Sequence, residues 1–508
     1  MTLAVVRTRA IDGLEAPAVL VEVHLANGLP SFTLVGLADT EVKEARERVR
    51  AALAHSGLGF PNNKRITVNL APADLPKESG RFDLPIALGI LAAAGQIDAA
   101  ALDRYEFAGE LSLAGELRPV RGALALALAV RHEGASRTLV LPEQSANEAA
   151  LAERVDVRAA RHLLDVVAAL QPGNAAVPLP VARAPVASMA PFTLDLRDVR
   201  GQTGAKRALE IAAAGHHSLL MVGPPGTGKS MLAQRLSGLL PPMSDNEALA
   251  SAAIASLASA FDPDRWMVRP FRAPHHSATS AALVGGGSPP RPGEISLAYA
   301  GVLFLDEIAE LPRAALEALR EPLETGRITI SRAARQASFP ARFQLIAAMN
   351  PCPCGYLGAF AATQRHCRCT PDAVARYQGK LSGPLMDRID IQVEVPAVRP
   401  AELMGAADGE ASAVIAARVH AARRRQEQRQ GVTNAELPVA ELERHCQLDS
   451  TSHDLLQRAA ERLGWSGRGL HRVQKLARTI ADLASSDRIR SIHIAEAMQW
   501  RRALPTTT

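Results

Sequence analysis

The segment from Gly223 to Ser230 has the residue types and spacing of a phosphate-binding loop. It fits the pattern GxxxxGK[ST] with Gly223, Pro224, Pro225, Gly226, Thr227, Gly228, Lys229 and Ser230. The apolar run SLLMV precedes it and MLAQRLSGLL follows, which predicts a strand, a loop and a helix. The glycines would let backbone N–H groups wrap phosphates at the positive end of that helix. Lys229 would reach the terminal phosphates and Ser230 would ligate magnesium, so the segment predicts an ATP site.

Two further apolar runs end in polar side chains that belong at the same sheet edge. VLFLDE ends in Asp306 and Glu307, and FQLIAAMN ends in Asn350. Open α/β sheets bind ligands at the carboxyl ends of their strands. We expect Asp306 to hold magnesium, Glu307 to polarise the attacking water and Asn350 to orient it. The alternatives are that the carboxylates cap a helix and that Asn350 only forms a turn.

Phosphoryl transfer gains about 10³ to 10⁵ in rate from a well-placed arginine, so the chain should supply one. The candidates are Arg388, in LMDRIDIQVEVP, and Arg468 and Arg472, in SGRGLHRVQKLART. An isolated arginine is otherwise an ordinary solvated charge. The run of arginines at 423–425 lies in a polar segment and is interpreted as the solvated face of a helix.

Four of the five cysteines lie close together in the chain, which favours a metal site over disulfides in a reducing compartment. Cys352 and Cys354 form one C-x-C pair, and Cys367 and Cys369 form a second. Four thiolates suit a tetrahedral zinc ion, although the spacing is tighter than the common C-x₂₋₄-C. The alternatives are unliganded thiols, or His366 in place of one cysteine. Cys446 stands alone and is expected to be buried.

Two segments could contact nucleic acid through basic side chains. ETGRITISRAARQASFPARF predicts a hairpin with Arg332 and Arg335 near its turn, where they would contact phosphates without reading bases. FRAPHHSATSAALVGGG carries Arg272, His275 and His276 and is a second candidate. Paired histidines are also common as hydrogen-bonded surface groups.

Length and composition indicate a multidomain α/β protein with many Ala-rich helices. The 508 residues suggest about three domains, and 47% hydrophobic with 21% charged residues argues against general disorder. A net charge of +5 permits contact with nucleic acid without requiring it. The start of the chain lacks a signal-peptide pattern and no apolar run is long enough to span a membrane, so we expect a cytoplasmic protein without a membrane partner.

A Pro- and Ala-rich stretch divides the chain near one third of its length. We predict four segments: an α/β domain, a linker, a P-loop core with a parallel sheet, and a helical lid, at 1–170, 171–191, 192–400 and 401–508.

The chain resembles the magnesium chelatase-like branch of AAA+ ATPases, and more closely the YifB/ComM competence-protein family. The resemblance spans nearly the whole chain and rests on SFTLVGLADTEVKEARERV, VNLAPADLPKESGRFDLPIALGIL, FRAPHHSAT, GEISLAYAGVLFLDE, NPCPCGYLG and GPLMDRIDI. It implies a hexameric ring with ATP bound between subunits. Arg388 would then act as a finger on the neighbour's nucleotide and Arg468 would be the lid's sensor arginine, with Arg472 less favoured. ComM members of the family resemble helicases that drive branch migration of recombination intermediates during natural transformation.

The same family carries a Lon-protease-like N-terminal fold of the ribosomal S5 type 2-like class, which suits residues 1–170. A Lon-type protease needs a serine nucleophile and a lysine that activates it. The stretch PKESGRFD places Arg81 where that serine belongs, and the nearby Ser79 has no evident base. We therefore expect a domain without a protease dyad.

Two functional hypotheses follow from these features. The first is an ATP-driven DNA motor that acts on branched or single-stranded DNA. The second is a ring ATPase that remodels a protein partner, or serves as a chelatase-type motor. Candidate loops rich in Arg, His and Gly favour DNA over polypeptide.

Overall fold

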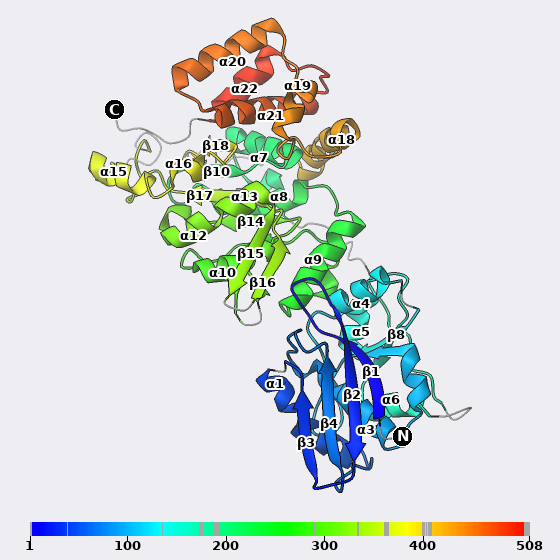
Figure 1. Cartoon of the computed structure of the whole chain (residues 1–508). Helices are drawn as coiled ribbons and strands as arrows, with labels where there is room; N and C mark the ends of the chain where they lie inside the picture. The colour runs from blue at the N-terminus through cyan, green and yellow to red at the C-terminus, as the bar shows by residue number, and fades with distance from the viewer. Residues whose placement is uncertain are drawn as a thin grey trace.

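The computed structural model arranges the chain as three groups of elements in a row (Figure 1). The N-terminal elements lie at one end, the P-loop strands lie in the middle, and α19 to α22 lie at the other end. The predicted α/β fold class, with a parallel sheet in the P-loop core and a helical C-terminal region, is confirmed. The structure describes residues 3–37, 39–134, 136–171, 176–186, 194–287, 290–332, 335–359, 365–398, 402, 404 and 409–501.

The described residues of the N-terminal group form two sheets, a short hairpin and six α-helices. The first sheet has the order β1-β2-β4-β3 and the second, all-parallel sheet has the order β5-β8-β9. The strands are β1 (Leu3–Arg9), β2 (Ala18–Ala26), β3 (Ser31–Val35), β4 (Arg65–Ala71), β5 (Tyr105–Phe107), β6 (Glu110–Leu111), β7 (Leu117–Arg118), β8 (Thr138–Pro142) and β9 (Val157–Ala160). The helices are α1 (Thr40–Lys43), α2 (Ala45–His55), α3 (Asp83–Ala93), α4 (Ala123–His132), α5 (Glu143–Ala149) and α6 (Leu163–Ala169).

Burial patterns explain why this group folds as two layers. Side chains of β2 and β4 alternate between buried and more exposed, because one face of the first sheet covers the core. Every residue of α3 is buried, as expected for a helix that is apolar all round after its first residue, Asp83, which pairs with Arg48. Helix α3 packs on β1 and β2.

The central group is built on a five-stranded parallel sheet with the order β11-β14-β17-β10-β18. Strands β10, β14 and β17 are buried along their whole length, which matches their apolar sequences. The one polar residue among them, Gln344 at the start of β17, donates its side-chain N–H to the carbonyl oxygens of Ala212 and His217. The strands are β10 (Leu219–Val222), β11 (Phe271–Arg272), β14 (Val302–Leu305), β17 (Gln344–Met349) and β18 (Ile391–Glu394).

Helices and two hairpins surround this sheet. The helices are α7 (Thr203–Gly215), α8 (Lys229–Leu236), α9 (Asp245–Leu257), α10 (Ser280–Val284), α11 (Glu294–Leu297), α12 (Arg313–Ala318), α13 (Arg320–Thr325), α15 (Pro371–Gln378) and α16 (Gly383–Met386). The hairpins are β12 (Gly285–Gly286) with β13 (Arg291–Pro292), and β15 (Arg327–Arg332) with β16 (Arg335–Pro340).

The C-terminal group is helical, with α18 (Ser412–Gln430), α19 (Leu442–His445), α20 (Ser450–Leu463), α21 (Gly467–Leu483) and α22 (Ser491–Gln499). Helix α18 packs on α7 of the central group. The interpretation of 423–425 as a solvated face is wrong for Arg423, which is buried and donates to the carbonyl oxygen of Ala213 at 2.6 Å. The side chain of Arg425 also bonds inward, to the carbonyl oxygen of Asp482. These arginines therefore hold α18 against its neighbours.

The N-terminal and central groups contact each other directly. Helix α4 packs on α9, and the N–H of Gly122 donates to the carbonyl oxygen of Ser256 at 3.3 Å. The described part of the predicted linker is not a free spacer, because the N–H of Ala182 donates to the carbonyl oxygen of Val157 in β9. The predicted domain boundaries themselves stay predictions.

Candidate nucleotide and metal sites

The P-loop connects the end of β10 to the start of α8. Gly228 precedes the first residue of α8 and has a φ of 87°, a left-handed conformation that favours glycine. Gly223 lies against Val395, the residue that follows β18, where a Cβ would stand 2.1 Å from the carbonyl oxygen. Both glycines are therefore required by the backbone path. The loop directs the N-terminal N–H groups of α8 to one place, which suits a phosphate.

Lys229 is the first residue of α8 and is 8% exposed. Its Nζ donates to the carbonyl oxygens of Gly223 at 2.7 Å and Pro224 at 2.8 Å. It also approaches Oδ1 of Asn350 at 3.3 Å. Burial lowers the pKa of Lys229 to about 8, although nearby Asp306 and Glu307 partly oppose that shift. The ammonium group thus rests on the loop's own carbonyls, beside the strand end that carries Asn350.

Ser230 and Asp306 meet across the site from different elements. The hydroxyl of Ser230 donates to Oδ2 of Asp306 at 2.7 Å, which brings together the two predicted magnesium ligands. Hydroxyl and carboxylate oxygens suit that ion, which acts as a Lewis acid on phosphoryl oxygens. Parallel pairing of β14 with β17 sets Asp306 and Asn350 at the same sheet edge. The structure therefore gathers Lys229, Ser230, Asp306 and Asn350 at one point.

Glu307 has a neighbour that the sequence did not predict. Oε2 of Glu307 lies 3.3 Å from Nδ1 of His276, a residue proposed from the sequence as a nucleic-acid contact. The ring of His275 lies 4.0 Å from that of His276, and its Nδ1 lies 2.8 Å from the hydroxyl of Ser277. Glu307 has a φ of 48°, uncommon for a side chain of this size. The loop after β11 thus touches the residue predicted to polarise water.

The remaining candidate nucleic-acid contacts have different surroundings. Arg272 makes two hydrogen bonds to Glu294, both 2.7 Å long, so a phosphate would have to compete with that carboxylate. Arg332 and Arg335 form the last backbone pair of the β15–β16 ladder, and their side chains lie outside the described part of the structure. All the candidate DNA contacts stay predictions.

Arg388 and Arg468 converge on one carboxylate at the opposite edge of the sheet from the P-loop. Both pair with Oε1 of Glu324, and Nη1 of Arg468 lies 3.4 Å from it. Arg388 is 7% exposed, whereas Arg468 extends into solvent.

The backbone fixes which edge Arg388 occupies. Its carbonyl oxygen accepts a hydrogen bond from Ser218, the residue before β10, at 2.9 Å. The four residues of β10 separate that point from the P-loop by about 13 Å. The backbone of Arg388 therefore lies at the sheet edge opposite the phosphate-binding loop of its own chain. Arg472 stabilises this region, because its guanidinium pairs with Asp390 and donates to the carbonyl oxygen of Arg388.

In the N-terminal group, Arg81 lies where a Lon-type serine was expected and is buried. Its Nε donates to the hydroxyl of Ser79 at 3.1 Å. Burial lowers the pKa of Arg81 to about 10, which still leaves it protonated near neutrality. Lys77 donates to the carbonyl oxygen of Pro72. A protonated guanidinium cannot activate Ser79 as a base, so Arg81 does not replace the missing lysine; the absence of a protease dyad stays a prediction.

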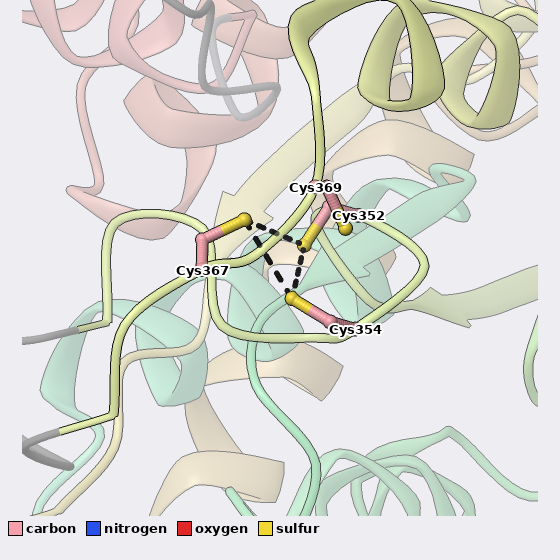
Figure 2. Close-up of side chains that lie close together, drawn as sticks. All are labelled: Cys352, Cys354, Cys367 and Cys369. Atoms are coloured by element: carbon pink, nitrogen blue, oxygen red, sulfur yellow. Dashed lines mark hydrogen bonds between the residues drawn. The ribbon is translucent and has the colours of Figure 1, made fainter.

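The four clustered cysteines do meet in space (Figure 2). Sγ of Cys352 lies 3.4 Å from that of Cys354 and 3.7 Å from that of Cys367, and Cys354 and Cys367 are 3.6 Å apart. The fourth sulfur, of Cys369, lies within 4.8 Å of the others. Tetrahedral zinc with bonds of about 2.3 Å needs sulfur separations of about 3.8 Å. Cys446 is buried elsewhere, as predicted.

The pKa values of the cysteine thiols in this cluster also favour a bound cation. Burial alone would raise the pKa of Cys354, but backbone N–H groups of Tyr356 and Arg368 donate to it and lower the pKa to about 6. Burial and the neighbouring thiols raise the pKa of Cys367 to about 12. Four thiols this close cannot all ionise without a positive charge between them, and metal binding would release their protons.

Glu324 and the pairing of His276 with Glu307 are the features that sequence reasoning missed. A glutamate near the end of a helix carries no motif. The FRAPHHSAT segment did indicate function, but not that His276 reaches Glu307.

Comparisons with known proteins agree with this architecture. Family models described as subunit ChlI of Mg-chelatase, as magnesium chelatase subunit ChlI, and as its C-terminal part match residues 21–145, 195–403 and 409–501. The Competence protein ComM of Haemophilus influenzae is 51% identical over 506 residues, which cover 99% of this chain and 98% of that protein. YifB of Salmonella typhimurium is 50% identical over 99% of this chain and 97% of its own length. YifB of Escherichia coli is 48% identical over the same shares.

Within the part of the chain that the structure describes, no helix has both the length and the apolar character needed to cross a bilayer.

Proposed function

Because the chain belongs to the YifB/ComM family of magnesium chelatase-like AAA+ ATPases, we propose that it is an ATP-driven DNA motor. In this proposal it promotes branch migration of recombination intermediates during DNA uptake. The family itself indicates an ATPase. The name of ComM refers to competence, and the high identity along the full chain supports a competence-related role here.

One observation supports hydrolysis most directly: five predicted residues meet at the carboxyl edge of the central sheet. Lys229 and Ser230 would hold phosphate and magnesium, with Asp306 as the second magnesium ligand. Glu307 would accept the proton of the attacking water, and Asn350 would orient that water beside Lys229. Positioning and electrostatic stabilisation account for most of the rate in phosphoryl transfer, and these groups provide both.

The position of Arg388 supports a site that is shared between subunits. It lies at the sheet edge opposite its own P-loop, so the nucleotide it could reach belongs to another copy of the chain. Arg468 shares its carboxylate partner and is assigned to the same neighbouring site. A closed ring satisfies this head-to-tail arrangement for every subunit, and the family resemblance suggests six.

The contact between His276 and Glu307 supports DNA as the substrate that controls hydrolysis. A loop that binds DNA through His275 and His276 would change the position of Glu307 directly. The β15–β16 hairpin would supply phosphate contacts through Arg332 and Arg335. The zinc proposed at the cysteine cluster would be structural, because all four ligands come from the protein.

The test is the rate of ATP hydrolysis with and without DNA of several forms. We expect forked or four-way DNA to raise the rate, and binding to weaken steeply with added salt because phosphate contacts release counterions. Hydrolysis that ignores every DNA form but responds to a protein client would instead support the remodelling or chelatase-type alternative.

A further inference from the structure

We propose that the metal ion of the cysteine cluster is a structural part of the nucleotide site. It fixes the turn Cys352–Gly355 against the P-loop, so its loss weakens nucleotide binding. This inference rests on the ATP and zinc sites of the proposed function, and it adds a physical link between them.

Gly355 makes the contact between the two sites. A Cβ at this position would lie 2.8 Å from Cδ of Pro225 in the P-loop and 3.9 Å from Cγ of Asn350. Gly355 also has a φ of 85° and donates its N–H to the carbonyl oxygen of Cys352 at 3.0 Å. The turn that carries two of the four cysteines is therefore packed on both the P-loop and the residue beside Lys229.

The other two cysteines come from the far end of the same loop. Cys369 immediately precedes Thr370, the N-cap of α15, and Cys367 lies two residues earlier. At the end of that helix, Gln378 donates to the carbonyl oxygen of Pro351 at 3.0 Å. A metal ion bound by all four sulfurs would thus join the end of β17 to the start of α15 (Figure 2).

A metal ion in the cysteine cluster would affect the nucleotide site through two contacts. The first is the contact of Gly355 with Pro225, which sets one side of the P-loop. The second is Asn350, two residues before Cys352, whose Oδ1 lies 3.3 Å from Nζ of Lys229. Cys352 is fully buried, so a displaced turn would disturb the side chains packed around it, two residues from Asn350. Close-packed interiors transmit such displacements to their neighbours.

Two kinds of variant test the metal ion and the contact between Gly355 and Pro225 separately. The double variant Cys367→Ser and Cys369→Ser removes two ligands that lie outside the turn. Gly355→Ala keeps all four ligands and places a methyl group against Pro225. Gly358→Ala is the matched control, because Gly358 has a similar φ of 76° but no atom of the described residues within 4 Å of the added Cβ.

For each full-length variant, the measurements are zinc content, far-UV circular dichroism and the Kd of a fluorescent ADP analogue. We expect the double variant to lose zinc and stay folded, and Gly355→Ala to keep zinc. The Kd of the double variant should be at least about fivefold that of the wild type, and the Kd of Gly355→Ala at least about fivefold that of Gly358→Ala. Fivefold is the low end of the effect expected for an over-packed contact. Wild-type protein stripped of zinc should show the same rise, reversed by added zinc.

The outcomes distinguish this inference from the proposed function. A folded, zinc-free double variant with wild-type Kd overturns the link, and so does a zinc-loaded Gly355→Ala variant with unchanged Kd. If Kd changes as predicted but no form of DNA alters the rate of ATP hydrolysis, the DNA-motor proposal is wrong and the link between the metal site and the nucleotide site is supported.

Discussion

The lowered pKa of Lys229 predicts that nucleotide binding depends on pH. Burial brings this pKa to about 8 in the nucleotide-free site, well below its ordinary value. A bound phosphate would stabilise the ammonium form and raise the pKa again, so binding takes up a proton wherever the free lysine is neutral. The charged fraction of the free lysine falls from about 90% at pH 7 to about 10% at pH 9. Kd should therefore rise by roughly tenfold between these values.

The assay is titration of a fluorescent nucleotide between pH 7 and 9.5, where the terminal phosphate of the nucleotide is mostly ionised. Calorimetry at pH 8.5 in buffers of different ionisation enthalpy should show uptake of more than half a proton per nucleotide bound. The variant Lys229→Ala should bind more weakly at every pH and lose this dependence. A wild-type Kd that stays constant to pH 9, or no proton uptake, would refute the assignment of Lys229 to the phosphates.

Three further predictions concern other parts of the chain. Burial raises the pKa of Glu148 to about 7, so the free energy of unfolding should fall as pH rises from about 4.5 to 7. Glu148→Gln should flatten this dependence. In urea denaturation at pH 8, the variant should have a free energy of unfolding higher by at most about 3 kcal/mol. Arg388→Ala should lower the rate of ATP hydrolysis by about 10³ while the Kd for nucleotide changes less than twofold. Equal losses of hydrolysis rate and nucleotide affinity would contradict action of Arg388 on a neighbouring subunit's site. Asp482→Ala should destabilise the helical region by about 3 to 5 kcal/mol, since it leaves buried Arg478 without its carboxylate. The exposed Asp487→Ala control should stay near wild type.

Local chemistry explains which parts of the account could be predicted from the sequence. The P-loop, the carboxylate strand and the strand ending in Asn350 are each encoded within about ten consecutive residues, and parallel pairing brings their ends together. The cysteine cluster was also visible, because its four residues lie close in the chain.

Other features depend on tertiary contacts that no local pattern specifies. Arg423 looked solvated because its helix is polar, yet packing against α7 buries it. Glu324 lies in α13 and meets its arginine partners only through tertiary packing, because Arg388 comes from the segment after α16 and Arg468 from α21. The contact between Gly355 and Pro225 likewise joins residues that are far apart in the sequence.

Movement of a four-way DNA junction is the most direct test of the central claim. The measurement is conversion of a labelled, homologous junction to its branch-migrated products, with purified protein, magnesium and either ATP or a non-hydrolysable analogue. The account predicts conversion by the wild type only with ATP, and none by Lys229→Ala, whose rings should still assemble. Conversion by Lys229→Ala, or by the wild type with the analogue, would contradict a motor driven by hydrolysis at this P-loop.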